Sequence, residues 1–110
     1  MKCRTSPCPV SRALDVLGDP WSLLIIRDML VMEKRQFSEF LDSPEGIATN
    51  ILTSRLNRLI EAGLVVKVIP EGQKRASYEP TKKAIALGPV LKAFAKWGSK
   101  HQATPSDGSA

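Results

Sequence analysis

The stretch that decides the fold is residues 47–75, which read IATNILTSRLNRLIEAGLVVKVIPEGQKR. Apolar residues recur at three- and four-residue spacing in its first half, which predicts a helix over about residues 48–62 that Gly63 ends. One side of this helix is apolar and comprises Leu52, Leu56, Leu59 and Ile60. The opposite side is polar and comprises Asn50, Thr53, Ser54, Asn57 and Arg58. A face that serves only solubility more often carries Glu and Lys than such amides and hydroxyls.

A hairpin is predicted directly after this helix, over about residues 64–80. An apolar run over residues 64–70 leads into a basic turn over residues 71–75, and the chain returns through residues 76–79. A polar-faced helix followed by a basic hairpin is the winged-helix pattern. Because amide and hydroxyl groups match base edges in the major groove, the pattern indicates double-stranded DNA as the partner.

The rest of the chain is predicted to be mostly helical. Four further helices are expected at about residues 9–17, 21–32, 37–41 and 82–100. Asp19 is expected to cap the second of them, with Pro20 at its first position. That helix is apolar nearly all round, which places it at the centre of the core. We expect an irregular arm over residues 1–7, a single domain over residues 1–102, and a flexible tail over residues 103–110.

Composition and charge agree with this interpretation. The 110 residues include 43% hydrophobic and 25% charged residues, which is typical of a globular chain. The formal net charge is +5 and the pI is about 9.5, which favours polyanionic partners. The position of the charge matters more than its size, and many cations flank the predicted recognition helix and hairpin: Lys34, Arg35, Arg55, Arg58, Lys67, Lys74 and Arg75.

No secretory signal or membrane span is predicted. The most apolar run lies within residues 21–32, is interrupted by Arg27 and Asp28, and falls short of the roughly 20 residues that cross a bilayer. We therefore expect a cytoplasmic protein without a membrane partner. Because the cytosol is reducing, we do not expect a stable structural disulfide between Cys3 and Cys8.

Motifs spread over residues 8–98 form a consistent set. They are Cys8-Pro9, residues 14–18, Trp21 to Asp28, Phe37 with Phe40-Leu41, Gly46-Ile47, residues 52–56, Leu59, Gly63-Leu64-Val65, Tyr78, Thr81-Lys82-Lys83, and Pro89-Val90-Leu91 with Trp97-Gly98. In these motifs the chain resembles the HxlR-type winged helix-turn-helix transcriptional regulators (MarR-like). The sequence departs from the family pattern at Gln36 (usually Arg), Ala48 (often Ser) and Ala84 (Gly).

The helical wheel and the resemblance together nominate the DNA-binding residues. Base reading is assigned to the polar helix face: Thr49, Asn50, Thr53, Ser54 and Asn57. Phosphate or wing contacts are assigned to Lys34, Arg35, Arg58, Lys74 and Arg75. Arg55 falls within the apolar arc, so a structural ion pair with Glu39 or Asp28 is favoured over DNA contact. The alternatives are a merely solvated helix face and a merely charged hairpin tip.

Two apolar stripes exceed what one small core needs. The first and last predicted helices carry them, and the interface candidates are Val10, Leu14, Leu17, Val90, Leu91, Phe94 and Trp97. The resemblance implies that these helices build a homodimer. The expected fold is therefore α+β, mostly α: a winged helix-turn-helix with a two-stranded β-hairpin wing and N- and C-terminal dimerisation helices. A two-fold dimer presents its recognition helices roughly 34 Å apart on a palindromic operator.

Cys8 is the candidate thiol sensor. It lies at or beside the predicted N-cap of the first helix, where the positive end of the helix dipole favours a thiolate. A reachable thiolate reacts with oxidants and electrophiles, and the resemblance implies regulators that sense such effectors through a cysteine at this place. The alternative is that Cys8 is a small buried hydrophobe. The expected effector is an oxidant or another small molecule. Cys3 is a candidate resolving partner.

Other functions are disfavoured. The lone His101 argues against a Ser-His-Asp or Cys-His enzyme, and the glycines form no phosphate-binding loop. Cys3, Cys8 and His101 are too few for a zinc site, so no metal or cofactor is expected. RNA binding favours exposed aromatics, whereas the core is the expected place of Phe37, Phe40, Tyr78, Phe94 and Trp97. The remaining rival is a winged-helix protein-interaction or dimerisation module without specific DNA binding.

Overall fold

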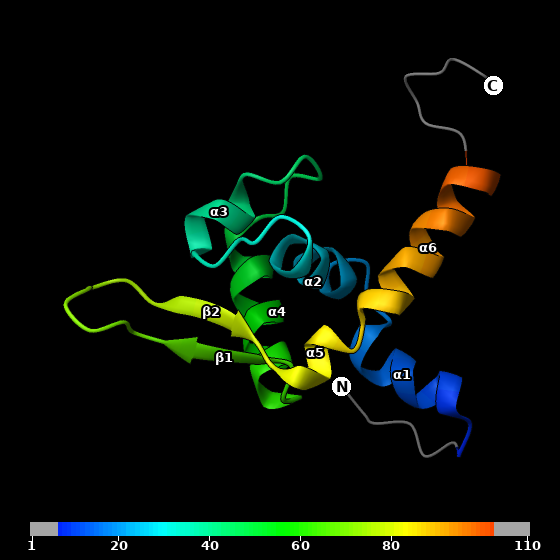
Figure 1. The fold of residues 1–110 in the computed structure, drawn as a ribbon, viewed down its shortest axis with the longest axis horizontal. Coiled ribbons are helices and arrows are strands. Elements are labelled where there is room, and N and C mark those ends of the chain that lie inside the picture. The colour runs from blue at the N-terminus through cyan, green and yellow to red at the C-terminus, as the bar shows by residue number, and fades with distance from the viewer. Residues whose placement is uncertain (1–6, 103–110) are drawn as a thin grey trace.

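A helical body carries one long β-hairpin in the computed structural model, which describes residues 7–102 (Figure 1). The elements follow in the order α1 (Pro9–Leu17), α2 (Ser22–Leu30), α3 (Phe37–Leu41), α4 (Thr49–Glu61), β1 (Val65–Val68), β2 (Ser77–Pro80), α5 (Lys82–Ile85) and α6 (Gly88–His101). The predicted mostly helical winged helix-turn-helix is confirmed. Residues 1–6 of the predicted arm and the predicted tail over residues 103–110 lie outside the described residues.

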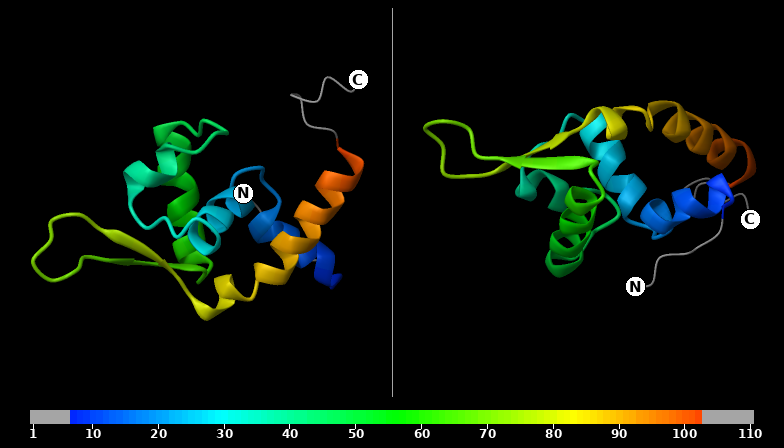
Figure 2. Two further views of the ribbon diagram at one scale, coloured as in Figure 1. Left: turned by 45° about the horizontal axis from the view of Figure 1, so that its top comes forward. Right: turned by 90° about the horizontal axis from the view of Figure 1, so that it is seen from below.

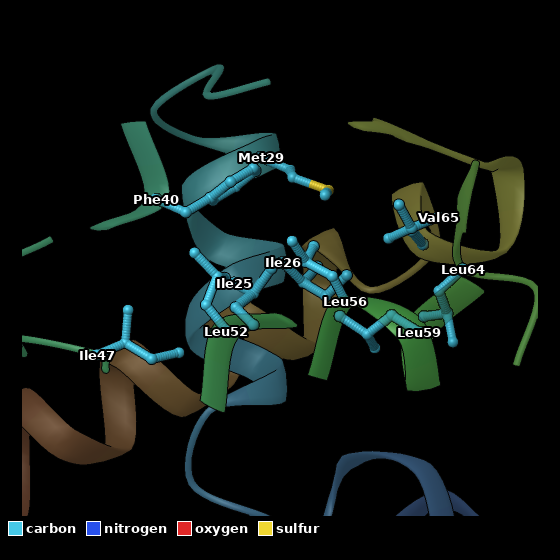
Figure 3. Close-up of a cluster of buried hydrophobic side chains, with 11 residues drawn as sticks. Ile25, Ile26, Met29, Phe40, Ile47, Leu52, Leu56, Leu59, Leu64 and Val65 are labelled. Carbon is cyan, nitrogen blue, oxygen red and sulfur yellow. The ribbon is translucent and has the colours of Figure 1, made fainter. Parts of the chain in front are cut away.

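Helices α2 and α4 meet in the core. Ile25 and Ile26 of α2 face Leu52 and Leu56 of α4, and none of the four is more than 3% exposed (Figure 3). The cluster is completed by Met29, Phe40, Ile47, Leu59, Leu64, Val65 and Ala84. The apolar stripe predicted on α4 is therefore buried, and the polar stripe opposite it must face outward.

The hairpin is anchored at its base on both sides. β1 and β2 pair antiparallel in the register Val65↔Pro80 to Val68↔Ser77. The Tyr78 N–H donates to the Arg35 carbonyl at 2.7 Å, and the Thr81 N–H donates to the Leu64 carbonyl at 3.0 Å. Gly63, with φ +81°, adopts the left-handed conformation that ends α4 and starts the wing.

The predicted second helix is shorter than expected at its end. α2 ends at Leu30 rather than at residue 32, because Glu33 takes a left-handed φ of 55° and the Lys34 N–H turns back to the Asp28 carbonyl at 3.0 Å. The expected start, with Asp19 as N-cap and Pro20 as first residue, is wrong, because Trp21 is the N-cap and the helix begins at Ser22. Asp19 still binds this end: its Oδ2 accepts the N–H groups of Trp21 and Ser22, each at 3.0 Å. The helix buries one side only, since Leu23, Leu24 and Leu30 are half-buried.

The prediction of one continuous helix over residues 82–100 is wrong. The chain forms a short α5 and a separate α6, with Ala86 and Leu87 between them. Pro89 lies in the first turn of α6 and has no N–H to continue the ladder from Ile85, which explains the break. The break turns α6 away from the hairpin (Figure 1).

The hairpin and the terminal helices lie at opposite ends of the molecule (Figure 2). The tip of the hairpin lies at one end, and α1 and α6 lie together at the other (Figure 2). Within residues 7–102, none of the helices has the length and apolar character needed to cross a membrane.

Candidate nucleic-acid interface

The polar face of α4 is open to solvent. Its five nominated base-reading residues are all exposed: Thr49, Asn50, Thr53, Ser54 and Asn57. Two of these side chains already hold local hydrogen bonds, since Thr53 Oγ1 donates to the Thr49 carbonyl at 3.0 Å and Ser54 Oγ accepts from Arg55 Nη1 at 3.2 Å. The amides of Asn50 and Asn57 offer both donors and acceptors for base edges.

The start of α4 lacks a side-chain cap, because Ala48 has no side-chain acceptor. Ala48 occupies the N-cap position with extended backbone, φ −73° and ψ 149°, and Thr49 does not take over its role. A Ser at this position stabilises a helix by about 1 kcal/mol relative to Ala. The uncapped backbone N–H groups of the first turn are thus available to a phosphate.

The wing presents the most exposed cations of the interface. Lys74 and Arg75 are exposed, and no ion pair among residues 7–102 involves either of them. They line a cleft of about 480 Å³ between the wing and the start of α3, with Gln36, Phe37, Ser38, Lys67, Ile69, Ala76 and Tyr78. Three cations therefore line the cleft: Lys67, Lys74 and Arg75. The Lys67 ammonium lies 6.0 Å from the Tyr78 ring centroid.

Two of the nominated phosphate ligands are engaged within the protein. Lys34 Nζ donates to Ser43 Oγ at 3.1 Å and lies 3.8 Å from Asp28 Oδ2, with its side chain 19% exposed. Arg35 Nη1 donates to the carbonyl of Met29 at 2.8 Å, and its Nε donates to Glu79 Oε1 at 3.2 Å. Both cations therefore join α2 to the neighbouring loop and strand, and neither side chain extends freely into solvent.

Arg58 also differs from its predicted placement. The helical wheel places it on the open side, but its guanidinium turns toward α1 and the turn after it. Nη2 donates to the Asp15 carbonyl at 3.4 Å, and Nη1 lies 3.8 Å from Asp19 Oδ1. Its phosphate role stays a prediction that requires the side chain to leave these partners.

Arg55 is a structural residue, but its expected partners are wrong. Its Nε donates to Asp19 Oδ2 at 3.0 Å. Glu39 instead accepts the N–H groups of Arg35 and Gln36 at 2.9 Å each, and these backbone hydrogen bonds lower the pKa of its carboxyl. Asp28 accepts from Arg27 and Ser43. Nothing in the local sequence around Asp19, apart from its expected helix cap, indicates that it pairs with Arg55.

Cys8 is exposed at the N-cap of α1, which contradicts the alternative of a small buried hydrophobe. Its carbonyl accepts the Arg12 N–H at 3.0 Å, which places the thiol at the positive end of the helix. Cys3 and Arg4 lie outside the described residues. Residues 7–102 contain no cluster of three His, Cys, Asp or Glu side chains that would suit a metal ion.

The nominated interface residues are largely exposed on α1 and α6. Phe94 is 64% and Trp97 is 58% exposed, so the expectation that they pack into the core is wrong. Val10, Leu14 and Val90 are also exposed, while Leu17 and Leu91 are half-buried. Between α2 and α6 lies an apolar groove of about 620 Å³ that Phe94 and Leu91 help to line. This amount of open apolar surface is typical of an interaction site.

Comparison with known proteins fits this geometry. The model of the HxlR-like helix-turn-helix family matches residues 16–106. The chain belongs to this family. Relatives include the HTH-type transcriptional regulator sll1512 of Synechocystis sp., 34% identical over 84% of this chain and 68% of its own length. The regulator BH0655 of Halalkalibacterium halodurans is 30% identical over 86% of this chain and 84% of its own.

Solved structures agree with the family assignment. PA1607, a candidate transcription factor, superposes with a TM-score of 0.85 at 42% identity, covering 92% of this chain and 70% of its own. The redox regulator HypR in its reduced form superposes with a TM-score of 0.76 at 25% identity, covering 86% of this chain and 94% of its own. Reduced YodB of B. subtilis superposes with a TM-score of 0.70 at 27% identity, covering 88% of this chain and 96% of its own. The chain is thus a DNA-binding HxlR-type transcriptional regulator and not an enzyme.

Proposed function

We propose that this chain is a cytoplasmic homodimer that reads a palindromic sequence in double-stranded DNA through α4. The observation that carries the proposal is the polar face of α4, whose five nominated readers are all exposed beside a basic wing. Amides and hydroxyls on a helix suit base edges, while exposed cations beside it suit phosphates. Asn50 and Thr53 lead the readers because residues near the start of a recognition helix reach deepest into the groove.

The wing supplies affinity in this proposal. Lys74 and Arg75 project from the hairpin and stay solvated in the unbound chain, so no internal ion pair has to break when they meet phosphates. Lys34 and Arg35, which are engaged within the fold, contribute by holding the wing and the helix-turn-helix loop in place. Sequence information comes from α4, and phosphate contacts set the register.

The dimer is supported by the exposed aromatic side chains of α6. Phe94 and Trp97 belong to α6, and the exposed Val10 and Leu14 belong to α1. Both helices lie at the end of the molecule opposite the wing tip (Figure 2). Burying these side chains between two copies leaves both wings and both α4 helices free for one duplex. Each half-site then lies on one face of the DNA, about one helical turn from the other.

An oxidant or electrophile is the proposed effector, acting at Cys8. The thiol is exposed at the N-terminus of α1, where oxidants and electrophiles can reach it. HypR, a redox regulator, shares this fold at 25% identity. Because α1 also belongs to the proposed dimer surface, a modified Cys8 lies where it changes how the two copies meet.

The competing function is a protein-interaction module without specific DNA binding. One titration separates the two: fluorescence anisotropy of the reduced protein on a duplex from upstream of its own gene and on a scrambled duplex of equal length. Preference for the upstream duplex at equal salt supports the specific regulator, and oxidation with diamide then tests the effector. Equal, weak binding to both duplexes contradicts specific reading at this operator and favours the interaction module.

A further inference from the structure

We propose that Asp19 is a positioning residue for the recognition helix, which it holds through Arg55 and Arg58. Asp19 lies in the turn between α1 and α2, and both arginines belong to α4. The inference rests on the proposed DNA-reading function and adds the residues that set the orientation of the reading face.

Asp19 is itself rigidly held. Its Oδ2 accepts the N–H groups of Trp21 and Ser22 at 3.0 Å each, and its Oδ1 accepts the hydroxyl of Ser22 at 2.5 Å. Ser22 is 1% exposed and the Asp19 side chain is 12% exposed. Burial alone disfavours the charged form, but the hydrogen bonds from Ser22, Trp21 and Arg55 outweigh it and lower the pKa of Asp19. The carboxylate is therefore ionised at neutral pH and fixed to the start of α2.

The same carboxylate receives the two arginines from neighbouring turns of α4. Arg55 Nε lies 3.0 Å from Oδ2, and Arg58 Nη1 lies 3.8 Å from Oδ1. Arg58 Nη2 also donates to the carbonyl of Asp15, in α1, at 3.4 Å. α4 is thereby tied both to α2 and to α1, across 36 residues of chain in the case of Arg55.

One contact connects this anchor directly to the reading face. The Arg55 Nη1 group donates to Ser54 Oγ at 3.2 Å, and Ser54 is one of the exposed candidate readers. Removing the anchor therefore changes the hydroxyl of Ser54 as well as the tilt of α4. A displacement of α1, whose N-cap is Cys8, would reach the reading face by the same route.

The test uses the direction of an electrostatic effect. Asp19→Asn removes a negative charge, which by simple electrostatics strengthens binding to any DNA. A positioning role predicts the opposite for the specific duplex: an affinity lower by about tenfold, as expected when one base-reading side chain is misplaced, with scrambled duplex bound equally well or better. Glu61→Gln is the matched control, because it removes an exposed negative charge from α4 itself without touching the Asp19 contacts. A specificity ratio unchanged in Asp19→Asn, as in Glu61→Gln, would overturn the inference.

Arg55→Gln tests the other side of the pair and guards against a poorly folded Asp19 variant. A positioning role predicts a lower specificity ratio with an unchanged dependence of log affinity on log salt. A slope that falls by about one instead identifies Arg55 as a phosphate ligand and overturns the inference. Circular dichroism verifies that each variant is folded. A wild-type chain without any preference for its operator would contradict the proposed function and this inference together. A wild type that prefers its operator, with Asp19→Asn and Arg55→Gln variants that keep the same specificity ratio, would contradict the inference alone.

Discussion

Arg27 and Glu45 form a two-point ion pair, with Nη1–Oε2 at 2.8 Å and Nη2–Oε1 at 2.9 Å, between residues 18 positions apart. Arg27 also donates to Asp28 Oδ1, and Asp28 Oδ2 accepts the hydroxyl of Ser43 at 2.5 Å. Two side chains of α2 thus hold the loop that leads into α4. The start of the recognition helix is fixed by this network, as its middle is fixed by Asp19.

Removing Glu45 is predicted to reduce stability in a pH-dependent way. The hydrogen bond from Arg27 lowers the pKa of Glu45 below its ordinary value of 4.5, so the folded state holds the carboxylate more strongly than the unfolded chain does. The stabilisation is present above pH 4.5 and is lost as pH falls through the lower pKa of the folded state. For a partly exposed pair we expect a difference of about 0.5–1 kcal/mol at pH 7.

Urea denaturation of the wild type and Glu45→Gln at pH 7 and near pH 3 checks this prediction. The difference in free energy of unfolding should shrink toward zero at the lower pH. Glu71→Gln, in the exposed turn of the wing, serves as the control and should change little at either pH. An equal deficit of Glu45→Gln at both pH values would contradict the assigned role of the ion pair.

Removing the wing charges is predicted to weaken binding to every sequence. Lys74→Ala with Arg75→Ala should flatten the slope of log affinity against log salt by about 0.9 for each phosphate that the wing no longer neutralises, with the specificity ratio retained. Lys96→Ala with Lys100→Ala removes two exposed charges from α6 and is the matched control. If both double variants flatten the slope equally, net charge rather than the wing accounts for the effect.

Removing an aromatic from α6 is predicted to dissociate the dimer. Phe94→Ser or Trp97→Ser should raise the dimer dissociation constant by about 30-fold, which corresponds to a loss of about 2 kcal/mol at an interface hot spot. Sedimentation velocity over a concentration series measures this constant. Ile69→Ser is the control, because Ile69 is 63% exposed but lies in the wing. A similar effect of all three substitutions would argue against an α6 interface.

Replacing Cys8 is predicted to abolish the response to oxidants. Cys8→Ser keeps the size and polarity of the exposed N-cap side chain but provides no thiolate. Specific DNA affinity before and after diamide should then be equal, while the wild type changes. Cys3→Ser separates the sensor from a resolving partner. A full response retained in Cys8→Ser would exclude Cys8 as the sensor.

Elements with local signals at both ends are predictable from the sequence. The bounds of α1 agree with the expected residues 9–17, because Pro9 suits the first helical turn and Gly18 follows the last apolar residue. The outward polar face of α4 follows equally well from periodicity. Leu52 and Leu56 are buried on one side of the helix, so Asn50 and Thr53 on the other side face solvent.

The break between α5 and α6 is missed for a physical reason. The apolar stripe from Leu87 to Trp97 begins only after the break, so periodicity carries no signal between Ile85 and Gly88. The informative residue is Pro89, whose missing N–H interrupts the ladder. Phe94 and Trp97 show the related limit that a stripe identifies an apolar face but not the molecule that covers it.

The partners of the cations cannot be read from a helical wheel. Arg55 and Asp19 are 36 residues apart, and only the packing of α4 on α2 brings them together. Arg58 lies on the polar side of α4 but turns to α1 because a carbonyl and a carboxylate are within its reach. Long side chains find tertiary partners that leave no mark in local periodicity.

The central claim is that the polar face of α4 reads DNA bases, and a paired titration of Asn50→Ala tests it most directly. Fluorescence anisotropy would measure the affinity of the wild type and the variant for the operator duplex and for a scrambled duplex at one salt concentration. The account predicts that the variant binds the operator about tenfold or more weakly and the scrambled duplex almost as well as the wild type does. Equal losses of affinity on both duplexes, or none on either, would contradict base reading by this face.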